Sequence, residues 1–416
     1  MLRVPCLATA CWSRSSRRRK AGEASIGISS RPRLRSGRQS KETCVDGGTS
    51  TFMITPAYPK RPTITAGLPL VVLVMLATGF GCSPPRAGSD AEGETVGLTA
   101  SRRLMGVSWK VTVHAATHPQ AEQAAEAALD EVARLEGILS DYDPQSECSR
   151  LSAAAPVRRA VSDDLWEVLA ASRRFLEASE GGFDPAVGRL TALWRQSRKT
   201  GRLPREEKLE AALATAGAGA VVLHETPRPE GKPLREVELP RAGTRLDFGG
   251  IGMGYAIDAA MRLLARRGIT SAMVDASGDI AVSAAPPGRH AWRVAVAPLD
   301  PRDPEGPDEF LDLVNAAVTT SGDASQAVEI DGVRYSHVVD PRTGLGVRGP
   351  TAVTVIAADA TTADALATAA SVLGPAEGLA LIEKTPGTAA RFVWLEGQTI
   401  MKKRSGRWPR TPSERQ

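Results

Sequence analysis

Asp364 and Thr368 are the residues whose types and spacing best suit metal chemistry. They lie in the predicted helix "ATTADALATAASVLG" (360–374) and are four positions apart, so they share one helix face. A carboxylate with a hydroxyl one turn away suits a hard cation such as Mg²⁺, which takes few protein ligands and leaves positions for phosphate oxygens. Because an acid in the first helical turn also stabilises the helix dipole, the pair alone leaves both interpretations open.

A glycine run, "FGGIGMGYAID" (248–258), stands between a predicted strand end and a predicted helix. A dinucleotide-binding fingerprint requires Gly-x-Gly-x-x-Gly directly after a parallel strand. Here the spacing is Gly250-x-Gly252-x-Gly254, which argues against a Rossmann fold. Two interpretations remain: the loop approaches a phosphate, or its glycines allow close packing at a helix start without a ligand.

Two further stretches carry polar residues in turn sequences. In "GGFDPAVGRLTALW" (181–194), Asp184 precedes a proline, where an aspartate more often caps a turn than contacts a ligand. In "RYSHVVDPRTG" (334–344), Ser336 and His337 lie on a predicted strand that ends in a rigid turn at Asp340. A lone histidine on a strand is more often a packing or hydrogen-bonding residue than a catalytic one.

The elements that would position these residues mix strands and helices without strict alternation. Strands are predicted at 107–113, 271–275, 291–297, 333–339, 351–357 and 391–395, and helices at 119–139, 162–179, 204–217, 254–267 and 362–373. Residues 225–242 are interpreted as a Pro- and charge-rich excursion. The pattern favours an α+β fold with largely antiparallel sheet over a doubly wound α/β fold.

The basic charge of the chain is concentrated at its beginning. The net charge is +5, yet residues 1–52 carry 11 Lys and Arg against 3 Asp and Glu, so the rest is slightly acidic. No basic stripe remains that would indicate nucleic-acid binding. We interpret 1–52 as a basic low-complexity prefix, either a binding arm or sequence upstream of a misannotated start, because an export signal begins afresh at Met53.

Residues 53–82 have the organisation of an export signal. Lys60 and Arg61 precede an apolar stretch of signal-peptide length, which is short for a membrane span, and Cys82 follows it directly. Small residues before that cysteine are similar to a bacterial lipoprotein signal, although Gly79 stands where leucine is usual. We expect a protein exported to the periplasmic side and lipid-anchored through Cys82; an ordinary cleaved signal or an uncleaved anchor are the alternatives. A linker (83–102), a folded domain (103–400) and a loose tail (401–416) are expected to follow.

The order of eight segments carries a family resemblance. They are "LMGVSWKV" (104–111), "ILSDYDPQSECSRL" (138–151), "GGFDPAVGRLTALW", "LDFGGIGMGYAID" (246–258), "VDASGDI" (274–280), "TTSGD" (319–323), "RYSHVVDPRTG" and "VTVIAADATTADALATAASVLG" (353–374). Together they resemble the ApbE family of FAD:protein FMN transferases. The resemblance implies an α+β fold of mixed and antiparallel sheets with packed helices in a single catalytic unit.

The resemblance also implies a reaction and its partners. Family members use Mg²⁺ and FAD, and they transfer FMN from FAD to a Ser or Thr hydroxyl of an acceptor protein with release of AMP. The acceptor carries a motif resembling Asp-x-x-Ser/Thr-Gly-Ala-Ser/Thr and would belong to a membrane or exported redox system. Some relatives instead hydrolyse FAD to FMN and AMP.

The resemblance also implies roles for individual residues, which are carried over position by position. The resemblance implies FAD contacts at Met105, Tyr142, Gly182, Phe183, Asp184, Asp247, Met253 and Ser336. It implies a Mg²⁺ site made by the backbone oxygen of Gly250 with Asp364 and Thr368. His337 and Asp340 are candidates for the general base by their proximity in the sequence to Ser336.

The sequence departs from the family pattern at three places. Met253 stands where many members have Lys, Ser152 where Asn is common, and Ser277-Gly278-Asp279 where Gly-Gly-Asp/Glu is usual. These departures keep two alternatives open, a FAD pyrophosphatase and a flavin-binding lipoprotein without turnover.

Overall fold

The computed structural model describes residues 95–296, 299, 309–322 and 326–409. The predicted prefix and export signal, and the linker up to residue 94, lie outside the described residues. The described residues all belong to one compact unit.

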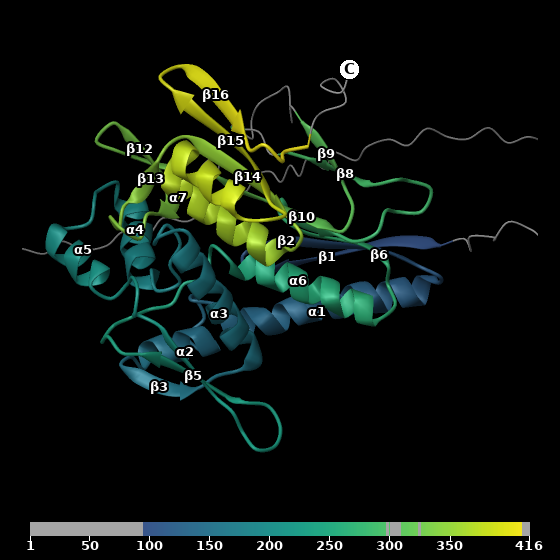
Figure 1. The fold of residues 1–416 in the computed structure, drawn as a ribbon, viewed down its shortest axis with the longest axis horizontal. Helices are drawn as coiled ribbons and strands as arrows, with labels where there is room; N and C mark the ends of the chain where they lie inside the picture. Colours follow the sequence, from purple (N-terminus) through teal and green to yellow (C-terminus); the bar gives the residue numbers. More distant parts are fainter. Residues whose placement is uncertain (1–94, 297–298, 300–308, 323–325, 410–416) are drawn as a thin grey trace, which may run out of the picture. The chain divides into compact units, whose positions relative to one another are not determined.

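An eight-stranded sheet forms the centre of the fold, with the order β1-β2-β6-β7-β10-β14-β15-β16 (Figure 1). Every neighbouring pair is antiparallel, which confirms the predicted α+β class. The strands are β1 (Val96–Leu104), β2 (Val107–Ala115), β6 (Ser271–Ala276), β7 (Asp279–Val282), β10 (Ala316–Gly322), β14 (Thr351–Ala357), β15 (Ala389–Glu396) and β16 (Thr399–Arg404).

Three helices pack side by side against this sheet: α1 (His118–Leu139), α6 (Gly252–Arg266) and α7 (Ala360–Lys384) (Figure 1). α1 touches β1 and β2, α6 touches β6 and β7, and α7 touches β10 and β14. Alternation along β10 separates two cores, since buried Ala317 belongs to the core under the helices and buried Val318 to a smaller core with Trp292 and Trp408.

The remaining elements surround this layer. They are α2 (Glu147–Ala153), α3 (Asp163–Ala178), α4 (Gly188–Thr200), α5 (Glu206–Leu213), a sheet of β3 (Val157–Ala160), β5 (Leu234–Leu239) and β4 (Val222–Thr226), a sheet of β11 (Val328–Ile330), β12 (Val333–Val339) and β13 (Gly346–Arg348), and the pair β8 (Trp292–Ala295) and β9 (Phe310–Leu313). Helix α4 packs against β12, and Trp194 of α4 donates its indole N–H to the carbonyl of Ser336 at 2.8 Å.

The structure corrects the predicted segment boundaries at both ends. β1 begins at Val96, inside the predicted linker, because it pairs with β2 from Val96 to Leu104. The predicted loose tail is packed as far as Trp408, since β16 pairs with β15 and the buried Trp408 donates to Glu309 Oε1 at 2.8 Å. The predicted excursion at 225–242 contributes to the hairpin of β4 and β5.

Helix α7 is long and apolar enough to cross a membrane by length and composition, but 61% of its apolar window is buried in this fold. Among the described residues it is the one helix that meets that test. It breaks at Gly374, whose φ of 78° and ψ of 178° are not helical and which precedes Pro375. The predicted helix end at residue 373 therefore coincides with this break, and α7 is a core helix of the sheet layer.

Candidate active site

The glycine run at the start of α6 lies directly against α7. A Cβ atom on Gly254 would stand 2.3 Å from the carbonyl oxygen of Ala360 and 2.9 Å from Cβ of Asp364. A Cβ on Gly250 would stand 2.8 Å from Cγ2 and 2.9 Å from Oγ1 of Thr368. The glycines are thus required by close packing between α6 and α7, and this packing brings Gly250 beside one predicted metal ligand, Thr368.

Asp258, one turn further along α6, fastens the start of α7. Its carboxylate accepts hydrogen bonds from the backbone N–H groups of Ala360 and Thr361, each at 2.8 Å, and from the hydroxyl of Thr361. These contacts satisfy N–H groups that a helix start leaves without intrahelical partners. Helix α6 therefore holds the first turns of α7, including Asp364, in a fixed position.

Asp364 is a buried carboxyl at this junction. Its Oδ2 accepts a hydrogen bond from the backbone N–H of Gly254 at 3.0 Å. Burial raises the pKa of Asp364 to about 7, although this hydrogen bond acts in the opposite direction. A bound cation would offset that cost by favouring the ionised carboxylate.

Asp279 at the start of β7 is a second buried carboxyl in the same neighbourhood. Its Oδ1 accepts from the backbone N–H of Thr320 at 3.2 Å. Burial, reinforced by the charge of Asp364, raises the pKa of Asp279 well above its ordinary value. The sequence marked Asp279 as the last residue of the 277–279 run and did not identify it as part of the site.

The residues at this junction fit Mg²⁺ by their chemistry. Asp364 offers a carboxylate, Thr368 a hydroxyl and Gly250 a backbone carbonyl, and all three are hard oxygen ligands. Within the described ranges, no group of three or more His, Cys, Asp and Glu side chains is arranged to hold a metal. A site of one carboxylate with a hydroxyl, a carbonyl and substrate oxygens does not need such a group.

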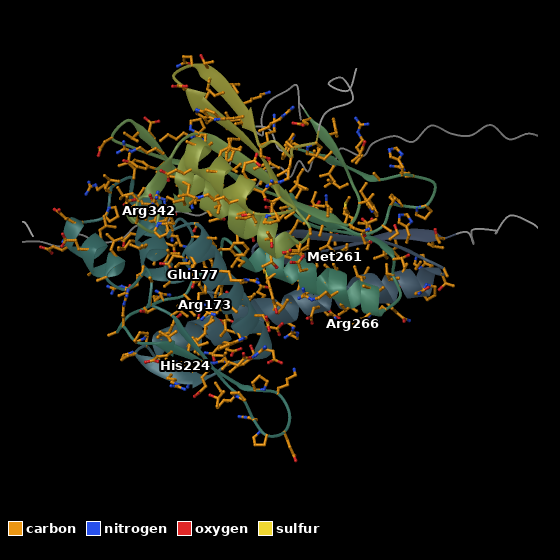
Figure 2. The ribbon with its side chains drawn as sticks, viewed as in Figure 1. Arg173, Glu177, His224, Met261, Arg266 and Arg342 are labelled. Carbon is orange, nitrogen blue, oxygen red and sulfur yellow. The ribbon has the colours of Figure 1, made fainter. Side chains whose placement is uncertain are left out.

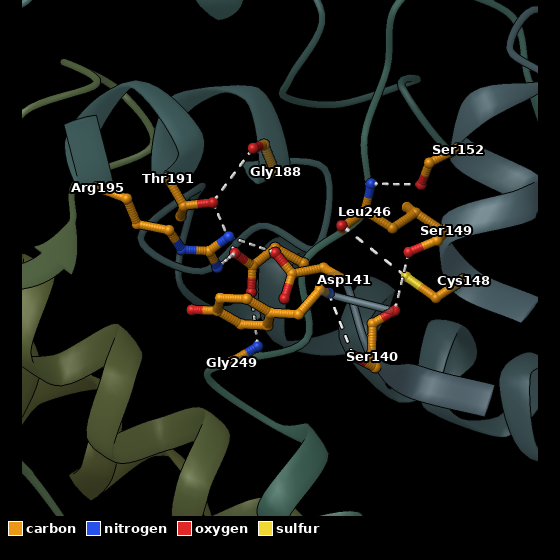
Figure 3. A network of polar contacts seen from close by, with 12 residues as sticks. Ser140, Asp141, Cys148, Ser149, Ser152, Gly188, Thr191, Arg195, Leu246 and Gly249 are labelled. Atoms are coloured by element: carbon orange, nitrogen blue, oxygen red, sulfur yellow. Dashed lines mark hydrogen bonds and ion pairs between the residues drawn. The ribbon is translucent and has the colours of Figure 1, made fainter. Parts of the chain in front are cut away.

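Asp247 forms a second polar centre at the entry to the glycine run, and its partners Thr191, Arg195 and Gly249 are labelled in Figure 3. Its Oδ2 accepts from the hydroxyl of Thr191 at 2.6 Å and from Nη2 of Arg195 at 2.9 Å, and its Oδ1 accepts from the N–H of Gly249 at 2.8 Å. Thr191 and Arg195 are four residues apart on α4 and so point to the same carboxylate. The sequence predicted Asp247 but missed these two partners, because both are more than 50 residues away from it along the chain.

Arg195 also connects Asp247 to the loop that carries Tyr142. Its Nη1 donates to Oδ2 of Asp141 at 2.6 Å, and its guanidinium carbon lies 4.2 Å from the centroid of the Tyr142 ring. Burial and the charge of Asp247 raise the pKa of Asp141, while the hydrogen bond from Arg195 opposes that rise. The structure therefore brings the predicted Asp247 and Tyr142 together through a residue that was not predicted.

The 182–184 turn lies beside α7. A Cβ on Gly182 would meet the side chain of Leu373 at 3.0 Å, and Phe183 is buried against Phe175 with ring centroids 6.3 Å apart. Asp184 is buried and accepts from the N–H groups of Ala186 at 2.8 Å and Gly217 at 2.6 Å. Its carboxylate thus accepts hydrogen bonds from two backbone N–H groups, which is the turn-capping role that is common for an aspartate before proline.

The predicted residues of β12 have different surroundings. Ser336 is buried and accepts from the N–H of Val338 at 3.1 Å, and it lines a small pocket with Gly322 and with Ser371 of α7. His337 is half-buried on the same strand. Asp340 is engaged by Arg342, which is labelled in Figure 2, through Nε to Oδ1 and Nη2 to Oδ2, each at 3.0 Å.

Three other residues named from the sequence are placed as follows. Met105 forms the turn between β1 and β2 with a positive φ of 48°, and its N–H donates to Glu136 Oε1 at 2.9 Å. Met253 is half-buried in the first turn of α6. The hydroxyl of Ser152 accepts from the N–H of Leu246 at 3.0 Å, next to Asp247.

Sequence comparison finds flavin transferases. The model of the ApbE family matches residues 105–392. A FAD:protein FMN transferase of Treponema pallidum is 33% identical over 341 residues, covering 78% of this chain and 90% of that protein. One from Escherichia coli K12 is 26% identical over 336 residues, covering 80% and 93%.

Solved structures agree with these matches. The apo form of the flavinyl transferase ApbE of Pseudomonas stutzeri is similar with a TM-score of 0.65 and 30% identity, covering 75% of this chain and 95% of that one. The ApbE protein of Thermotoga maritima gives a TM-score of 0.65 and 31% identity, covering 75% and 97%. With a family model that spans the glycine run, both polar centres and α7, the chain belongs to the ApbE family.

Proposed function

We propose that this protein is a Mg²⁺-dependent FAD:protein FMN transferase that attaches FMN to a Ser or Thr hydroxyl of an acceptor protein and releases AMP. The observation that carries the proposal is the junction of α6 and α7, where Gly250 lies against Thr368 and the N–H of Gly254 bonds to Asp364. The three oxygen ligands that we propose for Mg²⁺ belong to residues of this junction and of its glycine loop. Relatives named FAD:protein FMN transferases match over 78% and 80% of this chain.

Asp364, Thr368 and the Gly250 carbonyl would hold Mg²⁺. Bound there, Mg²⁺ would neutralise charge on the pyrophosphate oxygens of FAD as negative charge moves toward the leaving AMP. The glycines of this loop would let its backbone approach the phosphates, because a glycine has no side chain to exclude them.

The proposed transfer is a substitution at phosphorus. The acceptor hydroxyl oxygen forms a bond to the phosphorus of the FMN half, and the bond from that phosphorus to the bridging oxygen breaks. AMP leaves with the bridging oxygen, and the hydroxyl proton passes to a general base. We favour His337 over Asp340 as this base, because imidazole is the side chain that most often serves as a general base.

One incubation tests the proposal against its alternatives. Purified protein is mixed with FAD, Mg²⁺ and an acceptor that bears the Asp-x-x-Ser/Thr-Gly-Ala-Ser/Thr motif. A covalently fluorescent acceptor with stoichiometric AMP supports transfer. Free FMN and AMP without labelling supports a FAD pyrophosphatase, which the departures at Ser152 and Met253 keep open. Tight FAD binding with neither product supports a flavin-binding lipoprotein.

We further propose that the protein is exported and lipid-anchored through Cys82, on the strength of the 53–82 signal. Its acceptor would then belong to a membrane or exported redox system. Metabolic labelling with a fatty acid should mark the wild-type protein and not the Cys82→Ser variant. A Cys82→Ser protein that stays labelled and membrane-bound would contradict the anchor.

A further inference from the structure

Arg195 contacts three side chains on two loops that are far from it in the sequence: the neighbours Asp141 and Tyr142, and Asp247. Its guanidinium donates to Asp141 Oδ2 at 2.6 Å and to Asp247 Oδ2 at 2.9 Å, and it covers one side of the Tyr142 ring at 4.2 Å. Asp141 and Asp247 have side chains only 12% and 6% exposed, so a single cation balances two largely buried carboxylates. Figure 3 labels Arg195 of α4 and Asp141 of the loop after α1, whose side chains meet there.

Tyr142 is the most exposed of the large apolar or aromatic residues among those described, at 75%. Its exposure does not come from an unanchored loop, because its N–H and that of Asp143 both donate to Ser140 Oγ at 3.2 and 3.1 Å. A fixed backbone, a guanidinium on one face and an open opposite face make a flat aromatic surface. Such a surface favours stacking of a planar ring, since offset stacking buries apolar area on both partners.

We infer that Arg195 is a positioning residue of the substrate site. It holds the Tyr142 ring as a platform for the planar flavin ring, and it forms ion pairs with both Asp141 and Asp247. The inference rests on the proposed function for the identity of the ring. Lysine cannot replace arginine fully here, because its ammonium cannot donate in a planar fork to two carboxylates while stacking on an aromatic face.

Binding of FMN and AMP, measured separately by calorimetry and by flavin fluorescence, tests this role. We expect Arg195→Met to weaken FMN binding on the order of tenfold, which corresponds to about 1.4 kcal/mol, and to leave AMP binding unchanged. Arg195→Lys should fall between wild type and Arg195→Met. In turnover, the KM for FAD should rise with little change in kcat, because the platform contacts ground state and transition state alike.

Arg198→Met is the matched control. It removes a guanidinium from the same helix, one whose hydrogen bonds to Gln326 Oε1 are long, at 3.4 Å. A weakening of FMN binding equal to that of Arg195→Met would assign the effect to general charge and overturn the inference.

A double-mutant cycle separates positioning from mere structural support. Arg195→Lys is combined with Tyr142→Leu, which changes an exposed side chain and should not disturb folding. If Arg195 acts through the ring, the lysine substitution should cost much less in the Tyr142→Leu background. Fully additive effects would overturn the inference, and they can be measured even if Arg195→Met does not fold.

Three further outcomes would each contradict the inference. Folded Arg195→Met protein that binds FMN as tightly as wild type would overturn this inference alone. Weakened AMP binding with normal FMN binding would also overturn it, by assigning the platform to adenine. Wild-type protein that binds no flavin would overturn the proposed function and this inference with it.

Discussion

Replacing Gly254 with alanine is expected to separate α6 from α7 and to disable the junction on which the proposed metal site depends. The added Cβ would lie 2.3 Å from the Ala360 carbonyl oxygen and 2.7 Å from its carbonyl carbon, which are backbone atoms of α7. Restoring an ordinary contact of about 3.5 Å requires the helices to move apart by about 1 Å. The same movement would lengthen the 3.0 Å hydrogen bond from the Gly254 N–H to Asp364.

The expected loss of stability has two parts. Overpacking of a close contact costs about 1–3 kcal/mol, and weakening a hydrogen bond to a buried carboxylate costs about 1.5–3 kcal/mol. Their sum gives about 2.5–6 kcal/mol, or a fall in Tm on the order of 10 °C for a domain of this size. Turnover should fall further than stability alone predicts, because the displaced carboxylate is a proposed metal ligand.

Denaturant unfolding and Tm, with turnover measured well below Tm, provide the assay. Gly137→Ala is the control, since Gly137 lies in α1 with no atom within 4 Å of an added Cβ. That variant should be as stable as wild type or more stable by about 0.5–1 kcal/mol, because alanine is the better helix former. A Gly254→Ala protein with wild-type stability and turnover would refute the close packing of α6 on α7.

The other predictions concern the metal, the charge of the loop and the base. Asp364→Ala should abolish Mg²⁺-dependent turnover while the circular dichroism spectrum stays native; full activity would contradict the metal-site assignment. Because burial raises the pKa of Asp364 to about 7, the folded protein binds this proton more tightly than the unfolded chain, and metal-free stability should decline as pH rises from about 4 toward 7. Mg²⁺ must displace that proton, so the rise in Tm on adding Mg²⁺ should be larger at pH 8 than at pH 6; an equal rise at both would argue against Asp364 as a ligand. Met253→Lys should raise turnover if a missing positive charge limits the enzyme, and an unchanged rate in stopped-flow FAD turnover would dismiss that idea. His337→Gln should lower kcat far more than Asp340→Asn at matched FAD concentration, and the reverse order would exchange their roles.

Sequence reasoning predicted best where the signal was local. The helical spacing of Asp364 and Thr368 and the helix end before Gly374 both follow from a few neighbouring residues, and the structure has the helix and its break there. The hairpin of β4 and β5 was missed, because its short strands are half-exposed and lie in a Pro- and charge-rich stretch.

Residues joined only by the fold escaped sequence reasoning. Arg195 is 54 residues from Asp141 and 52 from Asp247, so nothing local marks it as their common partner. Asp279 became notable only when β7 placed it near Asp364. The glycine run was understood in part: its spacing excluded a dinucleotide fingerprint, but its packing against Thr368 and Ala360 required three-dimensional information.

The hydrogen bonds from the start of α7 to Asp258 affect the entropy of ligand binding. Because Asp258 holds the N–H groups of Ala360 and Thr361 and Gly254 holds Asp364, the ordering of these groups is completed when the chain folds. Binding of a cation and a pyrophosphate would then carry little further ordering cost, which favours affinity through preorganisation. The amide protons of residues 360 and 361 should consequently exchange with deuterated solvent as slowly as those of the sheet, with or without ligand.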